Sequence, residues 1–273
     1  MFLDKGAFLA RESYATIALN RRASEHVLII TLSRPEVHNA ISLGMIDEIT
    51  EVLAEAAGDP LLGCLVVTGA GEKTFTSGGD LKEFAGLRTR EQAEEMSLRM
   101  QRLARAIRNA PFPVLAAMNG DAYGGGLEFA LAADARVLDE RGRVGFLQVT
   151  IGVTPAWRGI SRARELLARS TAFLLMSTGE VVDAPRALTY GLVDRIAPAG
   201  AALAETLEIA RKIASHPPLA VRTIKQMLNV PLGDADEDLE REAAAFAGAW
   251  ISADHWEALA ARSERRRGRY TGT

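Results

Sequence analysis

Short apolar runs alternate with longer amphipathic segments along the first two-thirds of the chain. The run HVLIITL is rich in β-branched residues, and the segment after it repeats apolar side chains at helical spacing. Such alternation is typical of parallel β-α units in which helices cover a sheet, so we expect an α/β fold. The predicted strands are residues 26–32, 63–69, 112–120 and 134–139, and the predicted helices are residues 42–59 and 90–110.

The pattern becomes almost wholly helical after about residue 160. Gly, Pro and Asp breaks separate the predicted helices, and no internal repeat or low-complexity linker divides this part from the rest. We therefore expect the last third to pack on the core as a helical layer or subdomain. Amphipathic helices at the end of a chain also suit a subunit interface.

Composition and charge narrow the class of protein. The chain is 48% hydrophobic and 25% charged, as expected for a globular protein with a sizeable core. Its formal net charge of −3 gives no reason to expect nucleic acid or an anionic membrane as partner. Residues 1–14 mix charges into a short apolar stretch, so no signal peptide is predicted and a cytoplasmic location is expected. The single cysteine, Cys64, lies in a predicted strand and is expected in the core.

Two glycine-rich turns each precede a predicted helix start. Gly78 and Gly79 come before Asp80, a good N-cap residue, and three glycines at 124–126 come before an Ala/Leu-rich run. Both turns would direct free backbone N–H groups outward from a helix N-terminus. On neighbouring parallel strands, the two could converge on one oxygen atom as an oxyanion hole. The alternative is that both are ordinary β-α turns.

The sequence gives little support for a nucleotide-binding loop, a serine nucleophile or a metal site. Neither glycine-rich stretch spells the dinucleotide or Walker phosphate-binding motif. Ser77 lacks the G-x-S-x-G context of a nucleophile elbow. The four histidines are dispersed, without the spacing of a metal site.

An ordered series of segments resembles the crotonase (enoyl-CoA hydratase/isomerase) superfamily over nearly the whole chain. The resemblance implies a spiral core of repeated ββα units over residues 1–200. It also implies a C-terminal helical region over residues 201–273 that makes trimer contacts, in trimers that often pair into hexamers. The substrate would be an acyl-CoA thioester, with no separate cofactor. The segments are residues 32–42, 65–84, 113–137, 151–155 and 174–196 and the closing WEALAARSERRRGRY.

The resemblance also assigns roles to individual positions. The N–H groups of Gly79 and Gly125 would hold the thioester oxygen, and Glu128 would transfer the proton. An alternative for Glu128 is a carboxylate that caps its own helix, and an alternative for Lys82 is an exposed helix charge. The residues expected to line the CoA and acyl site are Ser77, Gly78, Lys82, Tyr123, Gly124 and Trp157.

The chain departs from the family at the second catalytic acid. Hydratases of the family use two glutamates, and the second position, four residues before Gly152, is Gln148 here. Residues 142–155 contain no Asp or Glu, and an amide cannot exchange a proton at useful pH. One acid with an oxyanion hole suits decarboxylation of a malonyl-type ester or double-bond isomerisation, so these remain open beside hydration. The non-enzymatic alternative is a catalytically impaired scaffold or RNA-binding homologue.

Overall fold

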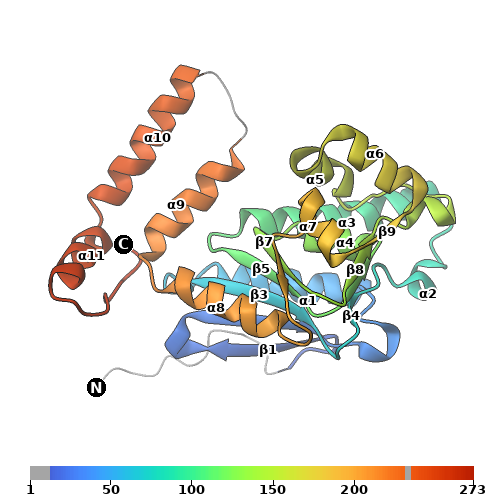
Figure 1. The fold of residues 1–273 in the computed structure, drawn as a ribbon, viewed down its shortest axis with the longest axis horizontal. Helices are drawn as coiled ribbons and strands as arrows, with labels where there is room; N and C mark the ends of the chain where they lie inside the picture. Colours follow the sequence, from blue (N-terminus) through green and yellow to red (C-terminus); the bar gives the residue numbers. More distant parts are fainter. Residues whose placement is uncertain (1–12, 231–234) are drawn as a thin grey trace.

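Two β-sheets form the centre of the computed structural model, which describes residues 13–230 and 235–273 (Figure 1). The larger sheet is parallel except that β1 runs antiparallel to β2, and the smaller sheet is parallel except at its β8–β9 pair. In sheet order the larger one contains β1 (Ile17–Arg22), β2 (Val27–Leu32), β3 (Cys64–Gly69), β5 (Val114–Met118), β7 (Ala135–Asp139) and β10 (Arg195–Ala197). The smaller one contains β4 (Thr74–Thr76), β6 (Asp121–Tyr123), β8 (Arg143–Gly145) and β9 (Val181–Asp183).

The strands and helices follow a repeating ββα order. In each unit the first strand joins the larger sheet, the second joins the smaller sheet, and a helix follows. This arrangement confirms the predicted α/β fold with ββα repeats. The units are β3–β4 with α2 (Leu81–Phe84) and α3 (Arg90–Asn109), β5–β6 with α4 (Gly125–Ala130), and β7–β8 with the 3-10 turn η3 (Gln148–Ile151) and α5 (Gly159–Leu166).

The central strands of the larger sheet are buried on both faces. Side chains alternate along a strand, so Val27 and Ile29 of β2 join the cluster that contains Leu207 of α8 (Ala202–Ala214). Leu28 and Ile30 point the other way and join the cluster of α1 (Leu43–Ala56), α3 and the smaller sheet. Cys64 lies in the α8 layer, fully buried as predicted, and burial raises the pKa of its thiol.

The prediction of an almost wholly helical last third is wrong in two places. Between α6 (Arg169–Thr178) and α8, the chain contributes β9 and β10 to the two sheets, on either side of α7 (Ala184–Tyr190). Each of these strands has three residues, which is too short for an alternating pattern to stand out between helices.

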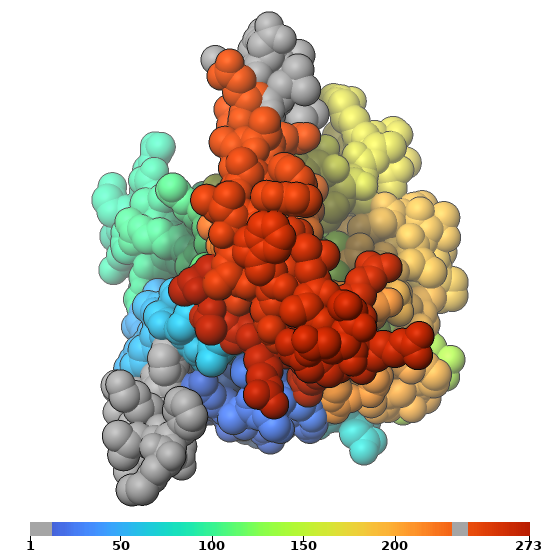
Figure 2. All heavy atoms as spheres, turned by 90° about the vertical axis from the view of Figure 1, so that its left-hand side faces the viewer, coloured from blue at the N-terminus to red at the C-terminus, as the bar shows by residue number. Residues whose placement is uncertain are grey.

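The C-terminal helices extend to one side of the sheets (Figure 1), and they face the viewer in Figure 2. They are α9 (Pro218–Asn229), α10 (Ala235–Trp250) and α11 (Ala253–Ser263). Lys225 anchors α9, because its buried ammonium donates to the carbonyls of Ile107 and Phe112 and lies 2.7 Å from an Asp134 oxygen. The division at residues 200/201 stays a prediction: α8 packs on the larger sheet, whereas α9–α11 lie beyond it.

No helix in the described ranges is long and apolar enough to cross a membrane. The predicted absence of a signal peptide concerns residues that lie mostly outside the described part of the chain.

Candidate active site

The two glycine-rich turns lie against each other at the end of neighbouring parallel strands. β4 pairs with β6, and each strand leads directly into one turn. A Cβ atom on Gly126 would lie 2.3 Å from the Thr76 carbonyl oxygen and 3.0 Å from the Gly78 nitrogen. A Cβ atom on Gly78, whose φ is +100°, would lie 3.1 Å from the Gly125 nitrogen. The turns need glycine because only bare backbone lets them approach this closely.

The N–H groups of Gly79 and Gly125 therefore lie at the N-terminal ends of two neighbouring helices, α2 and α4. Gly79 immediately precedes Asp80, the N-cap residue of α2, and Gly125 is the first residue of α4. Within residues 13–230 and 235–273, neither N–H donates a hydrogen bond to the protein. Both glycines are partly exposed, so a bound oxygen atom can reach them. The arrangement can stabilise negative charge on an oxygen.

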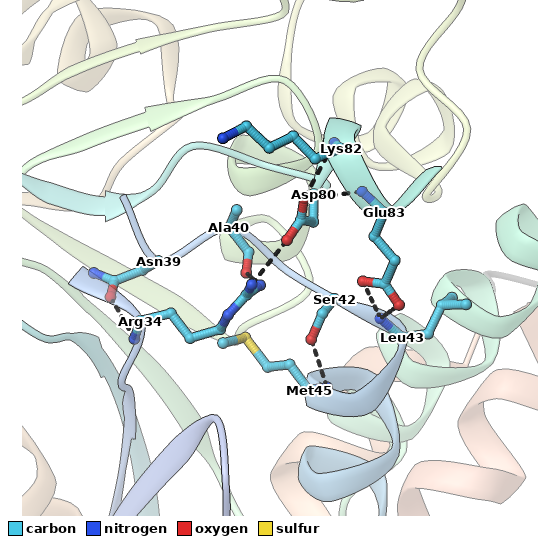
Figure 3. Close-up of polar contacts among 9 residues, drawn as sticks. All are labelled: Arg34, Asn39, Ala40, Ser42, Leu43, Met45, Asp80, Lys82 and Glu83. Atoms are coloured by element: carbon cyan, nitrogen blue, oxygen red, sulfur yellow. Dashed lines mark hydrogen bonds and ion pairs between the residues drawn. The ribbon is translucent and has the colours of Figure 1, made fainter. Parts of the chain in front are cut away.

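A polar network holds the first turn in place (Figure 3). Asp80 accepts hydrogen bonds from the first turn of α2 and from the Arg34 guanidinium at 2.8 Å, while Arg34 also donates to the Ala40 carbonyl. Asn39 accepts from the Arg34 backbone N–H. Partial burial favours a higher pKa for Asp80, but the bonds from Arg34 and the α2 amides outweigh it and leave the pKa lowered. Asp80 is therefore ionised and fixes the backbone on which Gly79 lies.

Removing this carboxylate is expected to affect both stability and the turn. Asp80→Ala should lower the free energy of unfolding by about 0.5–2 kcal/mol, the usual range for a lost N-cap, and should also reduce activity because Gly79 is released. Asp183→Ala is the matched control, because Asp183 caps α7 away from the glycine turns. Urea unfolding and kcat/KM measured for both variants check the prediction. Equal activity in the two would contradict a role for Asp80 in holding the turn.

Glu128 is buried immediately behind the second turn, and both of its carboxylate oxygens accept hydrogen bonds. Its Oε1 accepts from the backbone N–H groups of Trp157 and Gly159, each at 2.8 Å, and its Oε2 accepts from Gln148 Nε2 at 2.7 Å. Burial raises the pKa of Glu128 and outweighs the lowering effect of these three hydrogen bonds. The group therefore holds a proton at higher pH than an ordinary glutamate, which suits it to proton transfer.

Gln148 is the direct neighbour of this carboxylate. Its amide nitrogen faces Glu128, and its Oε1 is buried without a hydrogen-bond partner in the described part of the chain. With the acid ionised, the amide is oriented with its N–H₂ toward it and its oxygen free to accept a hydrogen bond. The residue can position a group in the site, but it cannot exchange a proton.

The remaining predicted site residues lie around the two turns. Trp157 is buried, and its ring lies against Gly125 and Gly79. Tyr123 donates its hydroxyl to Asp121 at 2.7 Å, and burial together with Asp121 raises its pKa to about 12. Ser77 and Lys82 are exposed next to Gly79, so their contact with CoA stays a prediction. Gly124 has φ +54° and faces Gln148, because a Cβ atom on it would lie 3.9 Å from that side chain.

The sequence pattern did not predict the role of Gly159. A Cβ atom there would lie 2.5 Å from the Cγ and Oε1 atoms of Glu128, so glycine is required for the carboxylate to reach the backbone. The residue before it, Arg158, has a left-handed backbone with φ +72°. A glycine beside an unusual turn was visible in TPAWRG, but the contact with Glu128 joins residues 31 positions apart.

Comparisons with known proteins agree with this fold. A family profile described as enoyl-CoA hydratase/isomerase matches residues 22–273. The putative enoyl-CoA hydratase/isomerase YngF of Bacillus subtilis is 35% identical over 250 residues, 91% of this chain and 96% of that protein. The short-chain-enoyl-CoA hydratase of Clostridium acetobutylicum is 32% identical, over 88% of this chain and 92% of that protein.

A crystal structure of an enoyl-CoA hydratase from Bacillus anthracis superposes with a TM-score of 0.90 at 34% identity, covering 95% of this chain and 100% of that one. The chain therefore belongs to the enoyl-CoA hydratase/isomerase family. The family membership that the sequence resemblance predicted is confirmed, and so is the expectation of an enzyme of this family.

Proposed function

We propose that the protein forms the enolate of an acyl-CoA thioester and moves a proton to or from it through Glu128 alone. The observation that carries the proposal is the contact between Glu128 and Gln148. The position expected for a second acid is a glutamine, whose amide nitrogen donates a hydrogen bond to the Glu128 carboxylate at 2.7 Å. The reactions that one acid can complete here are decarboxylation of a malonyl-type ester and isomerisation of a double bond.

The oxyanion glycines supply the stabilisation that both reactions need. As the electron pair forms at the α-carbon, charge moves to the thioester oxygen, which accepts hydrogen bonds from Gly79 and Gly125. Each such donor is worth about 2.7–4 kcal/mol in the hydrolase case. In decarboxylation, loss of CO₂ leaves the electron pair and protonated Glu128 then delivers a proton to the α-carbon. In isomerisation, ionised Glu128 removes an α-proton and returns a proton at the γ-carbon.

Hydration is the second candidate, supported by the names of relatives and by one feature of the site. The crotonyl-CoA hydratase of Syntrophomonas wolfei is 31% identical over 94% of this chain and 98% of that protein. The unpartnered Oε1 of Gln148 is an acceptor that a water molecule could satisfy beside Glu128. Such a water would have one acid to exchange protons with instead of two.

A substrate panel distinguishes these reactions. Wild-type protein and Gln148→Glu are assayed with crotonyl-CoA, a 3-enoyl-CoA and methylmalonyl-CoA. We expect the wild type to act on the 3-enoyl or methylmalonyl ester and to hydrate crotonyl-CoA slowly. Gln148→Glu should raise hydration by about tenfold or more, because it supplies the missing proton-exchanging group.

Gln92→Glu serves as the matched control, because Gln92 lies at the exposed start of α3. Brisk hydration of crotonyl-CoA by the wild type would contradict the proposed single-acid chemistry and favour the second candidate.

We also propose how the substrate and subunits associate. CoA would pass the exposed Ser77 and Lys82 on its way to Gly79, and no cofactor would be needed. The C-terminal helices would mediate a homotrimer or hexamer in the cytoplasm. In support, Phe246, Trp250 and Ile251 are large apolar residues exposed by 63%, 48% and 76% in the single chain.

A further inference from the structure

Trp157 occupies an unusual place, between the two glycine turns and the catalytic acid. We infer that its indole is the specificity-determining wall of the site and restricts the enzyme to short acyl groups. This inference rests on the proposed acyl-CoA function, and it concerns which acyl groups fit beside the oxyanion glycines.

The indole lies directly on both glycines. A Cβ atom on Gly125 would lie 2.3 Å from a carbon of the Trp157 six-membered ring, and one on Gly79 would lie 3.0 Å from the same ring. The far side of the space at Gly79 is occupied by Phe84, whose ring meets the indole edge-to-face with 6.4 Å between centroids. A thioester oxygen that accepts from both N–H groups would lie about 2.9 Å from each nitrogen, beside the two glycines that the indole contacts.

The backbone of the same residue holds the acid. The Trp157 N–H donates to Glu128 Oε1 at 2.8 Å, and the Gly159 N–H donates to the same oxygen. One residue thus contacts the oxyanion glycines with its ring and the carboxylate with its amide. At 5% exposure its ring has little freedom to move aside for a bulky acyl group.

An apolar cavity of about 700 Å³ lies on the other side of the segment that carries Trp157. Val149 and Pro155 line this cavity, whereas in the same segment the Gln148 side chain and the Trp157 backbone N–H donate to Glu128. Trp157 does not line this cavity, and the inferred wall is its indole, which closes the route to the cavity from the reacting carbon. A smaller residue at position 157 would open that route and give a longer acyl chain an apolar space.

Binding of unreactive thioesters tests the inference separately from catalysis. Acetyl-CoA, butyryl-CoA and octanoyl-CoA have neither an α-carboxylate nor a double bond, so they bind without undergoing the proposed reactions. Their Kd values are measured by calorimetry for the wild type, Trp157→Phe, Trp157→Ala and the control Tyr190→Phe, which changes a half-buried aromatic residue of α7. Free CoA gives the affinity without an acyl group.

We expect the wild type and Tyr190→Phe to bind butyryl-CoA about tenfold or more tightly than octanoyl-CoA, and Trp157→Ala to lose that preference. Trp157→Phe should retain part of it, and it also provides the test should the alanine variant fail to fold. An unchanged preference in a folded variant overturns the inference about Trp157 but leaves the proposed function standing. If no thioester binds better than free CoA, both fail. Loss of preference with no activity on any panel substrate supports the wall and overturns only the proposed reaction.

Discussion

Glu128→Gln is expected to lower kcat on the enzyme's preferred acyl-CoA ester by about 10²–10⁴-fold, the usual contribution of a positioned general acid or base. Glutamine has the same shape and still accepts from the N–H groups of Trp157 and Gly159, so the fold is preserved. The proton-transfer group is lost, while the oxyanion glycines remain. KM for the ester should change much less than kcat, and steady-state assays of the wild type and Glu128→Gln measure this directly.

Glu48→Gln is the control for the effect of changing a buried glutamate that lies away from the site. Glu48 is also a buried carboxylate, and it accepts hydrogen bonds from the N–H groups of Ala15 and Thr16, away from the glycine turns. This variant tests whether any buried glutamate would give the same loss through reduced stability. Full activity in Glu128→Gln, or an equal loss in Glu48→Gln, would contradict the assigned role.

The pH dependence of kcat/KM, measured for the wild type and Glu128→Gln, identifies whether the protonated or the ionised form of Glu128 acts. Burial raises its pKa, so the protonated form persists to higher pH than for a free glutamate. A decarboxylase needs the acid form, and its kcat/KM falls as the pH rises through this raised pKa. An isomerase needs the ionised form first, and its kcat/KM rises over the same interval. In Glu128→Gln this change of kcat/KM with pH should disappear.

The elements of the site that could be predicted from sequence are those set by local backbone chemistry. Gly78–Gly79 and Gly124–Gly126 mark turns that accept no side chain, and Asp80 marks a helix start, because each property depends on a few neighbouring residues. Most of the longer strands and helices were also predictable, since their apolar periods extend over several residues. The six-residue strand β1 was not predicted, because only its first residue, Ile17, is buried. Three-residue strands such as β4 and β6 carry no such period, although they position both turns.

Contacts across the fold could not be predicted in the same way. The sequence showed Gln148 in place of an acid, but not that its amide bonds Glu128 directly. It showed a bulky Trp157 near the site, but not that the ring lies on both glycines while the amide holds the carboxylate. These contacts depend on how η3 and the turn before α5 pack against α4, and no local pattern encodes that packing.

Lys225→Met should lower the free energy of unfolding by about 1–3 kcal/mol, the usual cost of leaving buried polar groups without their partner, because Lys225 is buried while Asp134 is partly exposed to solvent. Lys225 is 6% exposed and bonds to three acceptors, of which Asp134 is charged. Methionine fills similar space but leaves Asp134 without its cation and two carbonyls without a donor. Because Lys225 belongs to α9, the loss should also loosen the C-terminal helices, which urea unfolding and hydrogen exchange of α9 measure.

The double variant Lys225→Met/Asp134→Asn separates the lost pair from the uncompensated charge. Asparagine at position 134 can still accept from the Val114 N–H, which now donates to Asp134 at 2.7 Å. If the penalty comes mainly from a carboxylate left without its cation, the double variant should recover a substantial part of the stability. Lys82→Met, on an exposed lysine of α2, should change the stability by no more than about 0.5 kcal/mol. A double variant no more stable than Lys225→Met would instead assign the loss to the Ile107 and Phe112 carbonyls, and α9 would then be held by neutral acceptors rather than by charge.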